Sequence, residues 1–289
     1  MSSGHRPGNQ GSGTPLEDPH CENDAVPAVA IETDAELSIR LAVEAGHLLL
    51  ELRQQMFSAG APSWQVMDSG DLAAHKFLMK EFAAVRGGDA VLSEEGADDK
   101  RRLSSDRVWI VDPLDGTNEY GERGRHDWAV HIALWEKDRT TAAAVSLPAM
   151  DMVFGTDPAQ PMPDRRFDKP RLITSRNRAP YAAVIVANEL GCEAVRLGSA
   201  GAKAMAVVVG EADIYIHDGG MYQWDSAAPA AVAEAAGLHV SRVDGSPLVY
   251  NERDAWLPDF MVCRPEFAEP VLDALWGDKW RTRRDNGWR

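Results

Sequence analysis

Residues 109–117 read Trp-Ile-Val-Asp-Pro-Leu-Asp-Gly-Thr, an apolar run that ends in two carboxylates and a hydroxyl. The run from 108 to 111 is rich in β-branched and aromatic side chains, so it predicts a buried strand. Pro113 and Gly116 are turn residues, and they predict that this strand stops after residue 111. The polar side chains of the stretch should therefore gather at the end of a buried strand.

Asp112 and Asp115 are the two carboxylates at this predicted strand end. Neighbouring carboxylates repel each other unless one takes up a proton or a cation lies between them, and a divalent ion is the usual partner at neutral pH. Thr117 is near enough to polarise a water molecule bound to that ion. The alternative is an Asx-turn followed by a helix cap, which Asp-Pro-x-Asp-Gly can form without any ligand.

Length and composition describe a globular chain with little affinity for polyanions. Its 289 residues suffice for one large domain or for two modest domains that share a cleft. The net charge of −15 argues against nucleic acid or an anionic membrane as a partner. Cys21, Cys192 and Cys263 show neither disulfide nor zinc spacing, which favours a reducing cytoplasm. Neither a membrane-spanning segment nor a signal peptide is evident, so we expect a cytoplasmic protein.

Periodicity and composition divide the chain into a tail and two halves. Residues 1–32 are rich in Gly, Ser, Pro and charge, which is typical of a disordered tail. Residues 33–160 form an N-terminal α+β half, with helices at 33–56 and 71–82, strands at 90–92, 108–111 and 152–154, and a hairpin over 128–147. Residues 161–289 form a C-terminal α/β half, with strands at 182–187, 213–217 and Val240 and helices at 200–209 and 226–236. This order predicts a layered α/β protein, divided at the polar connection 157–170.

The second predicted helix carries an acidic residue at its start. We place its N-terminus near Ser69 or Asp71, because a break rich in Gly, Pro and Ser precedes it. Its inward face would consist of Leu72, Phe77, Leu78 and Phe82.

Further carboxylates stand at the ends of predicted elements. Glu94 and Glu95 follow a strand, and Asp225 directly precedes an Ala-rich helix, where an ordinary N-cap is an equally good explanation. With residues 109–117 and Asp71, they could bind two or three Mg²⁺ ions about 4 Å apart, while helix N-termini hold an anion. Such a set is typical of phosphate-ester hydrolysis, in which metal ions neutralise the phosphate and activate water.

Three motifs in this order resemble the signatures of a known enzyme family: Ser-Glu-Glu at 93–95, the stretch 109–117, and Trp-Asp-Ser-Ala-Ala at 224–228. They resemble the magnesium-dependent, lithium-inhibited phosphatases related to inositol monophosphatase, over about residues 33–265. Segments 71–75, 92–95 and 128–134 look closest to the bacterial branch that acts on 3′-phosphoadenosine 5′-phosphate, also called adenosine 3′,5′-bisphosphate, a by-product of sulfate assimilation. The resemblance implies an αβαβα sandwich, Mg²⁺ as cofactor, AMP and phosphate as products, and a homodimer.

The resemblance also implies roles for the matching residues. The implied metal ligands are Glu94, Asp112, the Leu114 carbonyl, Asp115 and Asp225. Asp71 and Thr117 would orient the attacking water, with Glu94 as a further catalytic residue. The backbone N–H groups of Gly116 and Thr117 would bind the phosphate. Glu95 would be a supporting or solvated carboxylate.

Two positions depart from the family pattern. Asp68 stands three residues before Asp71, where the family usually has Thr, and no Lys is evident at 61–65, so a third ion near Asp71 is left open. Pro229 stands where Gly commonly follows the third motif, and a helix tolerates Pro in its first turn.

Other matches concern the leaving group. Ser175, Arg176 and Arg178 resemble a Ser-Arg-x-His stretch of nucleotide-specific members, with Arg178 in place of His. Ser199 and Lys203 resemble their Gly-Ser-x-x-x-Lys segment, shifted by one residue. The resemblance implies that these five residues, with Asp225, bind the nucleotide. A solvated charge is the alternative for Lys203.

The sequence leaves the substrate open. Inositol monophosphate and fructose 1,6-bisphosphate are alternatives, as is a non-catalytic sensor that keeps the metal site. Tyr222 and Gln223 could line a base pocket, although packing is the simpler role for a single Tyr. His75, His131 and His217 lack partners at metal-ligand spacing, so we interpret them as core or surface residues.

Overall fold

The computed structural model describes residues 32–277, which belong to one compact unit that begins at Glu32. The predicted tail and Cys21 lie outside the described residues, apart from Glu32, whose carboxylate accepts hydrogen bonds from Arg40. The strands of the first sheet precede residue 160 and those of the second sheet follow it. The division into two domains at this point stays a prediction.

The first two helices pair with each other and cover the first sheet. α1 (Asp34–Ser58) begins at the predicted capping box, in which Thr33 and Glu36 satisfy each other's backbone N–H groups. α2 (Ser63–Val85) begins earlier than predicted, so Asp71 lies inside the helix. Gly70 does not interrupt the helix. A Cβ at this position would come within 2.5 Å of the Tyr120 ring, so glycine lets the ring pack directly against the backbone of α2.

The inward face of α2 also differs from the prediction at Leu72, whose side chain is 52% exposed. The buried residues of this helix recur every four positions, and they are Val66, Gly70, Ala74, Leu78 and Phe82. Leu72 lies two residues from this row, on the opposite side of the helix. The early start of the helix sets this register.

The first sheet has the order β1-β2-β3-β4-β5, with β1 parallel to β2 and the other pairs antiparallel. Its strands are β1 (Ala90–Ser93), β2 (Arg107–Asp115), β3 (Ala129–Glu136), β4 (Arg139–Leu147) and β5 (Met152–Gly155). The prediction that the central strand stops after residue 111 is wrong, because β2 continues to Asp115 through a bulge. Pro113 and Leu114 lie at this irregularity, where a missing ladder hydrogen bond is tolerated.

The second sheet has the order β10-β12-β8-β6-β7. Its strands are β6 (Arg171–Ser175), β7 (Glu193–Leu197), β8 (Ile214–His217), β10 (His239–Ser241) and β12 (Phe260–Cys263), and a separate pair joins β9 (Met221–Tyr222) to β11 (Trp256–Leu257). The strand predicted at 182–187 is wrong, because these residues belong to helix α4 (Tyr181–Glu189). β6 and β7 are parallel neighbours, and parallel strands need a crossover connection, which α4 supplies.

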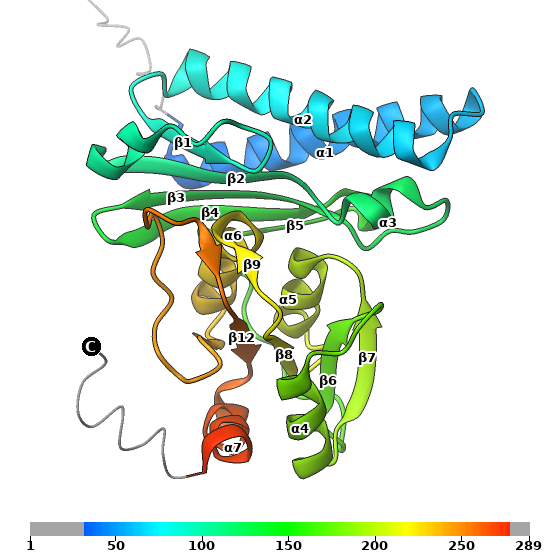
Figure 1. Ribbon diagram of the computed structural model, residues 1–289, viewed down its shortest axis with the longest axis vertical. Helices are drawn as coiled ribbons and strands as arrows, with labels where there is room; N and C mark the ends of the chain where they lie inside the picture. The colour runs from blue at the N-terminus through cyan, green and yellow to red at the C-terminus, as the bar shows by residue number, and fades with distance from the viewer. Residues whose placement is uncertain (1–31, 278–289) are drawn as a thin grey trace, which may run out of the picture. The chain divides into compact units, whose positions relative to one another are not determined.

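The remaining elements are α3 (Thr117–Gly121), α5 (Ala200–Val208), α6 (Gln223–Ala235), α7 (Pro265–Trp276), η1 (Lys100–Ser104) and η2 (Pro148–Met150). Figure 1 shows α1 and α2 above the first sheet, α5 and α6 between the two sheets, and α4 and α7 on the far side of the second sheet. This is the predicted αβαβα sandwich.

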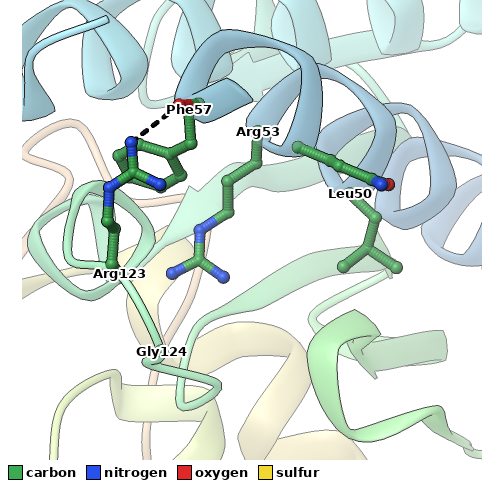
Figure 2. Close-up of a pocket in the computed structure, with 6 residues that line it drawn as sticks. Leu50, Arg53, Phe57, Arg123 and Gly124 are labelled. Carbon is green, nitrogen blue, oxygen red and sulfur yellow. Dashed lines mark hydrogen bonds between the residues drawn. The ribbon is translucent and has the colours of Figure 1, made fainter. Parts of the chain in front are cut away.

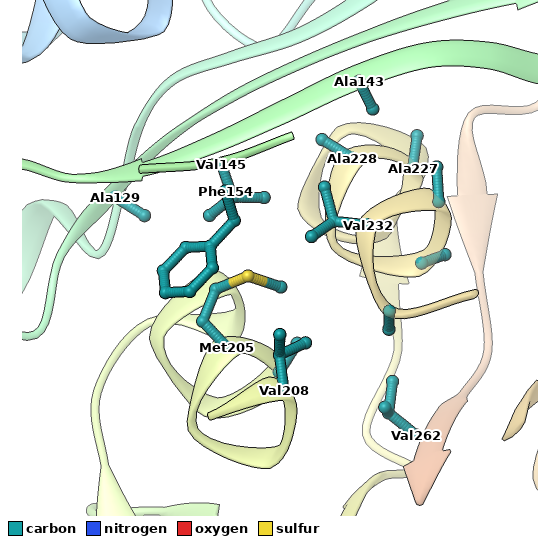
Figure 3. Close-up of a cluster of buried hydrophobic side chains, with 14 of the residues drawn as sticks. Ala129, Ala143, Val145, Phe154, Met205, Val208, Ala227, Ala228, Val232 and Val262 are labelled. Carbon is teal, nitrogen blue, oxygen red and sulfur yellow. The ribbon is translucent and has the colours of Figure 1, made fainter. Parts of the chain in front are cut away.

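Small side chains bring the middle helices close to the first sheet. Ala227 and Ala228 of α6 lie near Ala143 of β4, whereas Met205 of α5 fills the space beside Phe154 of β5 (Figure 3). Short side chains permit a close approach of helix and sheet without a cavity. The N-termini of both helices are thereby held against the end of β2.

A pair of arginines holds α3 against the C-terminal end of α1. Arg53 donates to the carbonyls of Tyr120 and Glu122, and Arg123 donates to the Phe57 carbonyl while its guanidinium lies 4.3 Å from the Phe57 ring centre (Figure 2). Cationic groups are favourable at the C-terminus of a helix, where carbonyls lack partners. These contacts fix α3 and therefore Thr117 at its start.

Candidate active site

Asp112, Asp115 and Asp225 come together at the end of β2, where one oxygen of each lies within 4.8 Å of the others. In a regular strand, side chains three residues apart point to opposite faces. The bulge in β2 changes this alternation, so that both aspartates face Asp225. The continuation of the strand past residue 111 is therefore what forms the cluster.

The Asx-turn that was the alternative to a metal site is present. Asp112 Oδ1 accepts a hydrogen bond of 3.0 Å from Leu114 N, and Gly116 (φ 88°) is the N-cap of α3. The turn leaves Asp112 Oδ2 buried, with no hydrogen-bond partner among residues 32–277. An unpaired buried carboxylate oxygen is costly, so the turn and a ligand role are compatible.

Asp71 and Thr117 meet as predicted, although Asp71 comes from the middle of α2. Thr117 Oγ1 lies 3.2 Å from Asp71 Oδ1 and 3.2 Å from the Leu114 carbonyl oxygen, so its hydroxyl can donate to either. The Leu114 carbonyl thus lies next to the proposed water-orienting pair.

Asp225 is the third residue of α6, not its N-cap, because the helix begins at Gln223. Its carboxylate accepts a hydrogen bond of 2.6 Å from Tyr222 N, and the first turn of a helix favours a negative charge. Pro229 consequently lies in the second turn of the helix, and its predicted place in the first turn is wrong. Pro229 has no N–H, so it leaves the Asp225 backbone carbonyl without its helical donor.

The carboxyl groups of this site resist ionisation in the absence of a cation. Burial is the main cause that raises the pKa values of Asp71 and Asp225 to about 7, and neighbouring carboxylates add to it. The pKa of Glu94 is also raised to about 7, by loss of surrounding water and by Asp115, Glu95 and Asp71, although the residue itself is exposed at the mouth of the site. Burial, Glu94 and Asp115 raise the pKa of Asp112 well above its usual value. Glu95 is exposed and adds negative charge near Asp71 and Glu94. Carboxyl groups with their usual pKa values would be ionised at pH 7. Ionisation of this cluster is unfavourable unless an opposite charge lies among the carboxylates, so the cluster favours a bound cation.

Asp115 differs from its neighbours because donors surround it. Ala200 N and Gly201 N, at the start of α5, donate to its two oxygens, and His131 Nε2 lies 3.2 Å from its Oδ2. Burial acts to raise the pKa of Asp115, but His131, Lys203 and Gly201 N together hold it below its usual value.

His131 is a site residue that the sequence interpretation missed. It is buried as predicted, yet it contacts Asp115, and its pKa is raised by that carboxylate although burial opposes the shift. The pairing of β2 with β3 could have revealed its role, because this pairing places His131 directly opposite Asp112.

These residues fit a divalent cation bound through oxygen ligands. The orphaned Oδ2 of Asp112, the raised carboxyl pKa values and the short separation of the three aspartates all follow from uncompensated negative charge. Hard cations such as Mg²⁺ prefer carboxylate and carbonyl oxygens.

The predicted nucleotide-binding cations occupy different environments. Arg176 is paired with Glu119 at 2.7 Å and with Glu122 at 2.8 Å, which joins the end of β6 to α3. Ser175 ends β6 and is partly buried, and Arg178 is exposed. Arg178 is therefore the more accessible of the two arginines.

Ser199 and Lys203 bond within the protein. Ser199 Oγ accepts from Ala202 N at 2.9 Å and caps α5, while Lys203, only 4% exposed, donates to the carbonyls of Gly198 and Ser199. A solvated charge is thus wrong for Lys203, and its contact with substrate stays a prediction. Gly116 lies beside Ser199, since a Cβ on Gly116 would come within 2.8 Å of the Ser199 Cβ.

Of the two residues considered for a base pocket, only Tyr222 is accessible. Tyr222 is 48% exposed and stacks on Trp224, with ring centres 4.7 Å apart. Gln223 is fully buried, where its side chain accepts from Asn251 N and donates to the Asp254 carbonyl.

Between residues 32 and 277 no helix is long and apolar enough to cross a membrane.

Comparison with known proteins agrees with this geometry. The model of the inositol monophosphatase family matches residues 31–161 and 164–276. The chain is 46% identical over 262 residues to a 3′-phosphoadenosine 5′-phosphate phosphatase of Mycobacterium leprae, covering 86% of this chain and 95% of that protein. It is 48% identical over 246 residues to the protein of that name from Mycobacterium bovis, covering 82% and 91%.

A solved structure shows the same fold. The CysQ protein of Bacteroides thetaiotaomicron, described as a bacterial member of the inositol monophosphatase family, superposes with a TM-score of 0.67 at 25% identity, covering 82% of this chain and 99% of that one. The family match spans both sheets and every carboxylate of the cluster. The chain therefore belongs to the inositol monophosphatase family.

Proposed function

We propose that this protein is a metal-dependent phosphatase that hydrolyses the 3′-phosphate of 3′-phosphoadenosine 5′-phosphate to give AMP and phosphate. The observation that carries the proposal is the cluster of Asp112, Asp115 and Asp225 beside the Thr117–Asp71 pair. The names of the relatives that are 46% and 48% identical support the choice of substrate.

The proposed ion is Mg²⁺, because the donors are carboxylates and one carbonyl. Asp112, Asp115 and Asp225, with Glu94 and the Leu114 carbonyl, would hold two or three ions. When bound, such ions neutralise the phosphate and lower the pKa of a water molecule. A cytoplasmic location, a role in sulfate assimilation and a homodimer are further proposals that rest on the family resemblance.

The chain's own groups can handle the proton of the attacking water. Asp71 can accept this proton through the Thr117 hydroxyl, which donates a hydrogen bond to it. Water oxygen then bonds to phosphorus, and the bond from phosphorus to the ribose 3′-oxygen breaks. The 3′-oxygen takes up a proton from solvent water, and Asp71 returns the proton that it accepted to solvent. The positive end of α5 supports Asp115 during this displacement.

The alternatives are activity on inositol monophosphate or fructose 1,6-bisphosphate, and a sensor without catalysis. The Asp71–Thr117 pair disfavours the sensor, because such a protein has no use for groups that orient water. Phosphate release from all three phosphate esters, each with and without Mg²⁺, tests the proposal. Release from none of them would favour the sensor, and release from inositol 1-phosphate alone would favour the first alternative.

We expect lithium to inhibit the enzyme at millimolar or lower concentration. A small monovalent ion could take the place of a divalent ion at the carboxylates but would stabilise the leaving oxygen less. The measurement is a lithium titration at low Mg²⁺, with sodium at equal ionic strength as the control. Equal rates in both salts would count against the lithium-sensitive mechanism.

We expect Arg178→Ala to lower kcat/KM for the nucleotide by about ten- to a hundredfold, since a charge-assisted contact contributes about 1.5 to 3 kcal/mol. Inositol 1-phosphate has no second phosphate, so its turnover should stay within about threefold. Lys203→Ala is the comparison: it removes bonds to Gly198 and Ser199, so both substrates should suffer equally. A loss confined to the nucleotide would instead support the direct contact predicted for Lys203.

A further inference from the structure

We propose that a cavity between the end of α1 and the loop after α3 binds a tetrahedral oxyanion, namely a sulfate or phosphate group. The cavity has a volume of about 440 Å³ and is lined by Leu50, Arg53, Gln54, Phe57, Arg123 and Gly124. The aspartates of the candidate active site do not line it. The proposal therefore concerns a second site, and it stands or falls independently of the proposed function.

Arg53 and Arg123 give this cavity a positive charge that no carboxylate neutralises. Neither guanidinium forms an ion pair with a carboxylate among residues 32–277, and the cavity lining contains no acidic residue. Glu122, the residue before Arg123, is instead paired with Arg176 at 2.8 Å. In a chain with a net charge of −15, a cavity with two uncompensated cations is a local exception that attracts anions.

The Phe57 ring holds the two guanidiniums near each other. Its centre lies 4.3 Å from the Arg123 Cζ and 5.6 Å from the Arg53 Cζ, and Figure 2 shows both side chains beside this ring. Arg53 is partly buried, and burial lowers the pKa of its guanidinium. Two neighbouring cations repel each other, so an anion between them would be favourable.

The hydrogen bonds of the two arginines leave N–H groups for a ligand. Arg53 uses Nε and Nη2 for backbone carbonyls at the end of α3, and Arg123 uses Nη2 for the Phe57 carbonyl. Arg53 Nη1 and the Nε and Nη1 of Arg123 have no hydrogen-bond partner within the described part of the chain. A backbone carbonyl carries no formal charge, so these bonds orient the guanidiniums without neutralising them.

The remaining donors indicate the class of ligand. Three nitrogens on two cations match an ion of charge −2 with at least three acceptor oxygens, as in sulfate and phosphate. A carboxylate offers one charge and two oxygens, so it fits less well. The cavity volume lies within the range of small-molecule sites, about 300–1,000 Å³, so the group can be a free ion or part of a phosphate ester.

Calorimetric titration of the metal-free protein with sodium sulfate in EDTA tests the proposal. Without a divalent ion the carboxylate cluster repels anions, which suppresses binding there. We expect a Kd of about 1 mM or lower. Arg123→Gln should weaken binding by about tenfold or more, and Arg123→Lys, which keeps the charge but not the planar donors, should weaken it less. Arg139→Gln, at an exposed arginine of β4, is the control and should bind as the wild type does.

Acetate and AMP, titrated under the same conditions, identify the ligand class. Acetate should bind more weakly than sulfate, and equal binding would overturn the assignment of a tetrahedral anion. AMP binding that is at least as tight as that of sulfate, and that Arg123→Gln weakens, would identify a phosphate ester. Weaker binding of AMP would identify a free ion.

Two further results would overturn the proposal: no saturable binding of sulfate or AMP, or equal binding by the wild type and Arg123→Gln. A second measurement needs no variant. In a crystal structure of the wild type with selenate, a tetrahedral dianion, the anion should lie within hydrogen-bond distance of both Arg53 and Arg123. Selenate bound only elsewhere would also contradict the proposal.

Discussion

Replacing Asp112 with asparagine should abolish phosphate release and at the same time make the metal-free protein more stable. Asp112 is fully buried, and its Oδ2 has no hydrogen-bond partner among the described residues, although His131 Nδ1 lies 4.0 Å from it. An amide supplies neither the charge nor the anionic oxygen that a divalent ion requires. Loss of about 4 kcal/mol of transition-state stabilisation corresponds to about a thousandfold fall in kcat/KM.

The gain in stability has a separate cause. Desolvation and the charges of Glu94 and Asp115 oppose ionisation of Asp112, and an asparagine side chain at this position would carry no charge. The amide oxygen can still accept from Leu114 N, so the Asx-turn should survive. We expect the Tm in EDTA at pH 8 to rise by about 4–8 °C, which corresponds to about 2 kcal/mol for a chain of this size.

Thermal unfolding and phosphate release measured on the same samples check both effects. Asp138→Asn is the matched control, because Asp138 is exposed in the β3–β4 turn at a positive φ that asparagine tolerates. It should leave activity and Tm unchanged. Near wild-type turnover of Asp112→Asn at saturating Mg²⁺ would exclude the proposed ligand role.

The second large effect is a loss of stability of the metal-free protein between pH 5 and pH 8. In the folded state the pKa values of Asp71, Glu94 and Asp225 are about 7, above their values of about 4 in the unfolded chain. The folded state therefore binds more protons across this range, and the free energy of unfolding falls as the pH rises through 7. Mg²⁺ replaces these protons and should remove most of the loss.

The expected size is moderate because the groups share protons and are partly open to solvent. A total of about 3–5 kcal/mol corresponds to a fall in Tm of roughly 10 °C in EDTA. The measurement is the difference between the Tm in Mg²⁺ and the Tm in EDTA at each pH. Taking this difference largely removes the contribution of titratable groups away from the site. His217 and His239 are examples: their lowered pKa values make the free energy of unfolding rise with pH. A difference that stayed constant from pH 5 to pH 8 would contradict the prediction.

Signals from neighbouring residues were enough to predict several elements of the fold. The capping box at Thr33 starts α1 where the sequence predicts it, and the two apolar segments of β3 and β4 form the predicted hairpin. These signals depend on neighbouring residues only, so no knowledge of the rest of the chain is needed. The same holds for the order of the three motifs, which identified the family.

Other elements depended on what packs against them. The apolar run at 182–187 has the composition of a strand, yet it forms α4 because the parallel pair β6–β7 requires a crossover. Gly70 looks like a helix breaker, yet it lies inside α2 because Tyr120 approaches it closely. In both places a tertiary contact outweighed the local preference.

At the site, the order of residues alone specifies which carboxylates and hydroxyl are available and that their excess charge calls for a cation. How these groups meet depends on the folded chain: the bulge in β2 turns Asp112 and Asp115 toward one side, and α6 adds Asp225 from a distant segment. The role of His131 also depends on the fold, because its partners Asp115 and Trp224 belong to other elements. The sequence contains the groups themselves, whereas distances between segments far apart in the chain arise only when the two sheets and their helices pack.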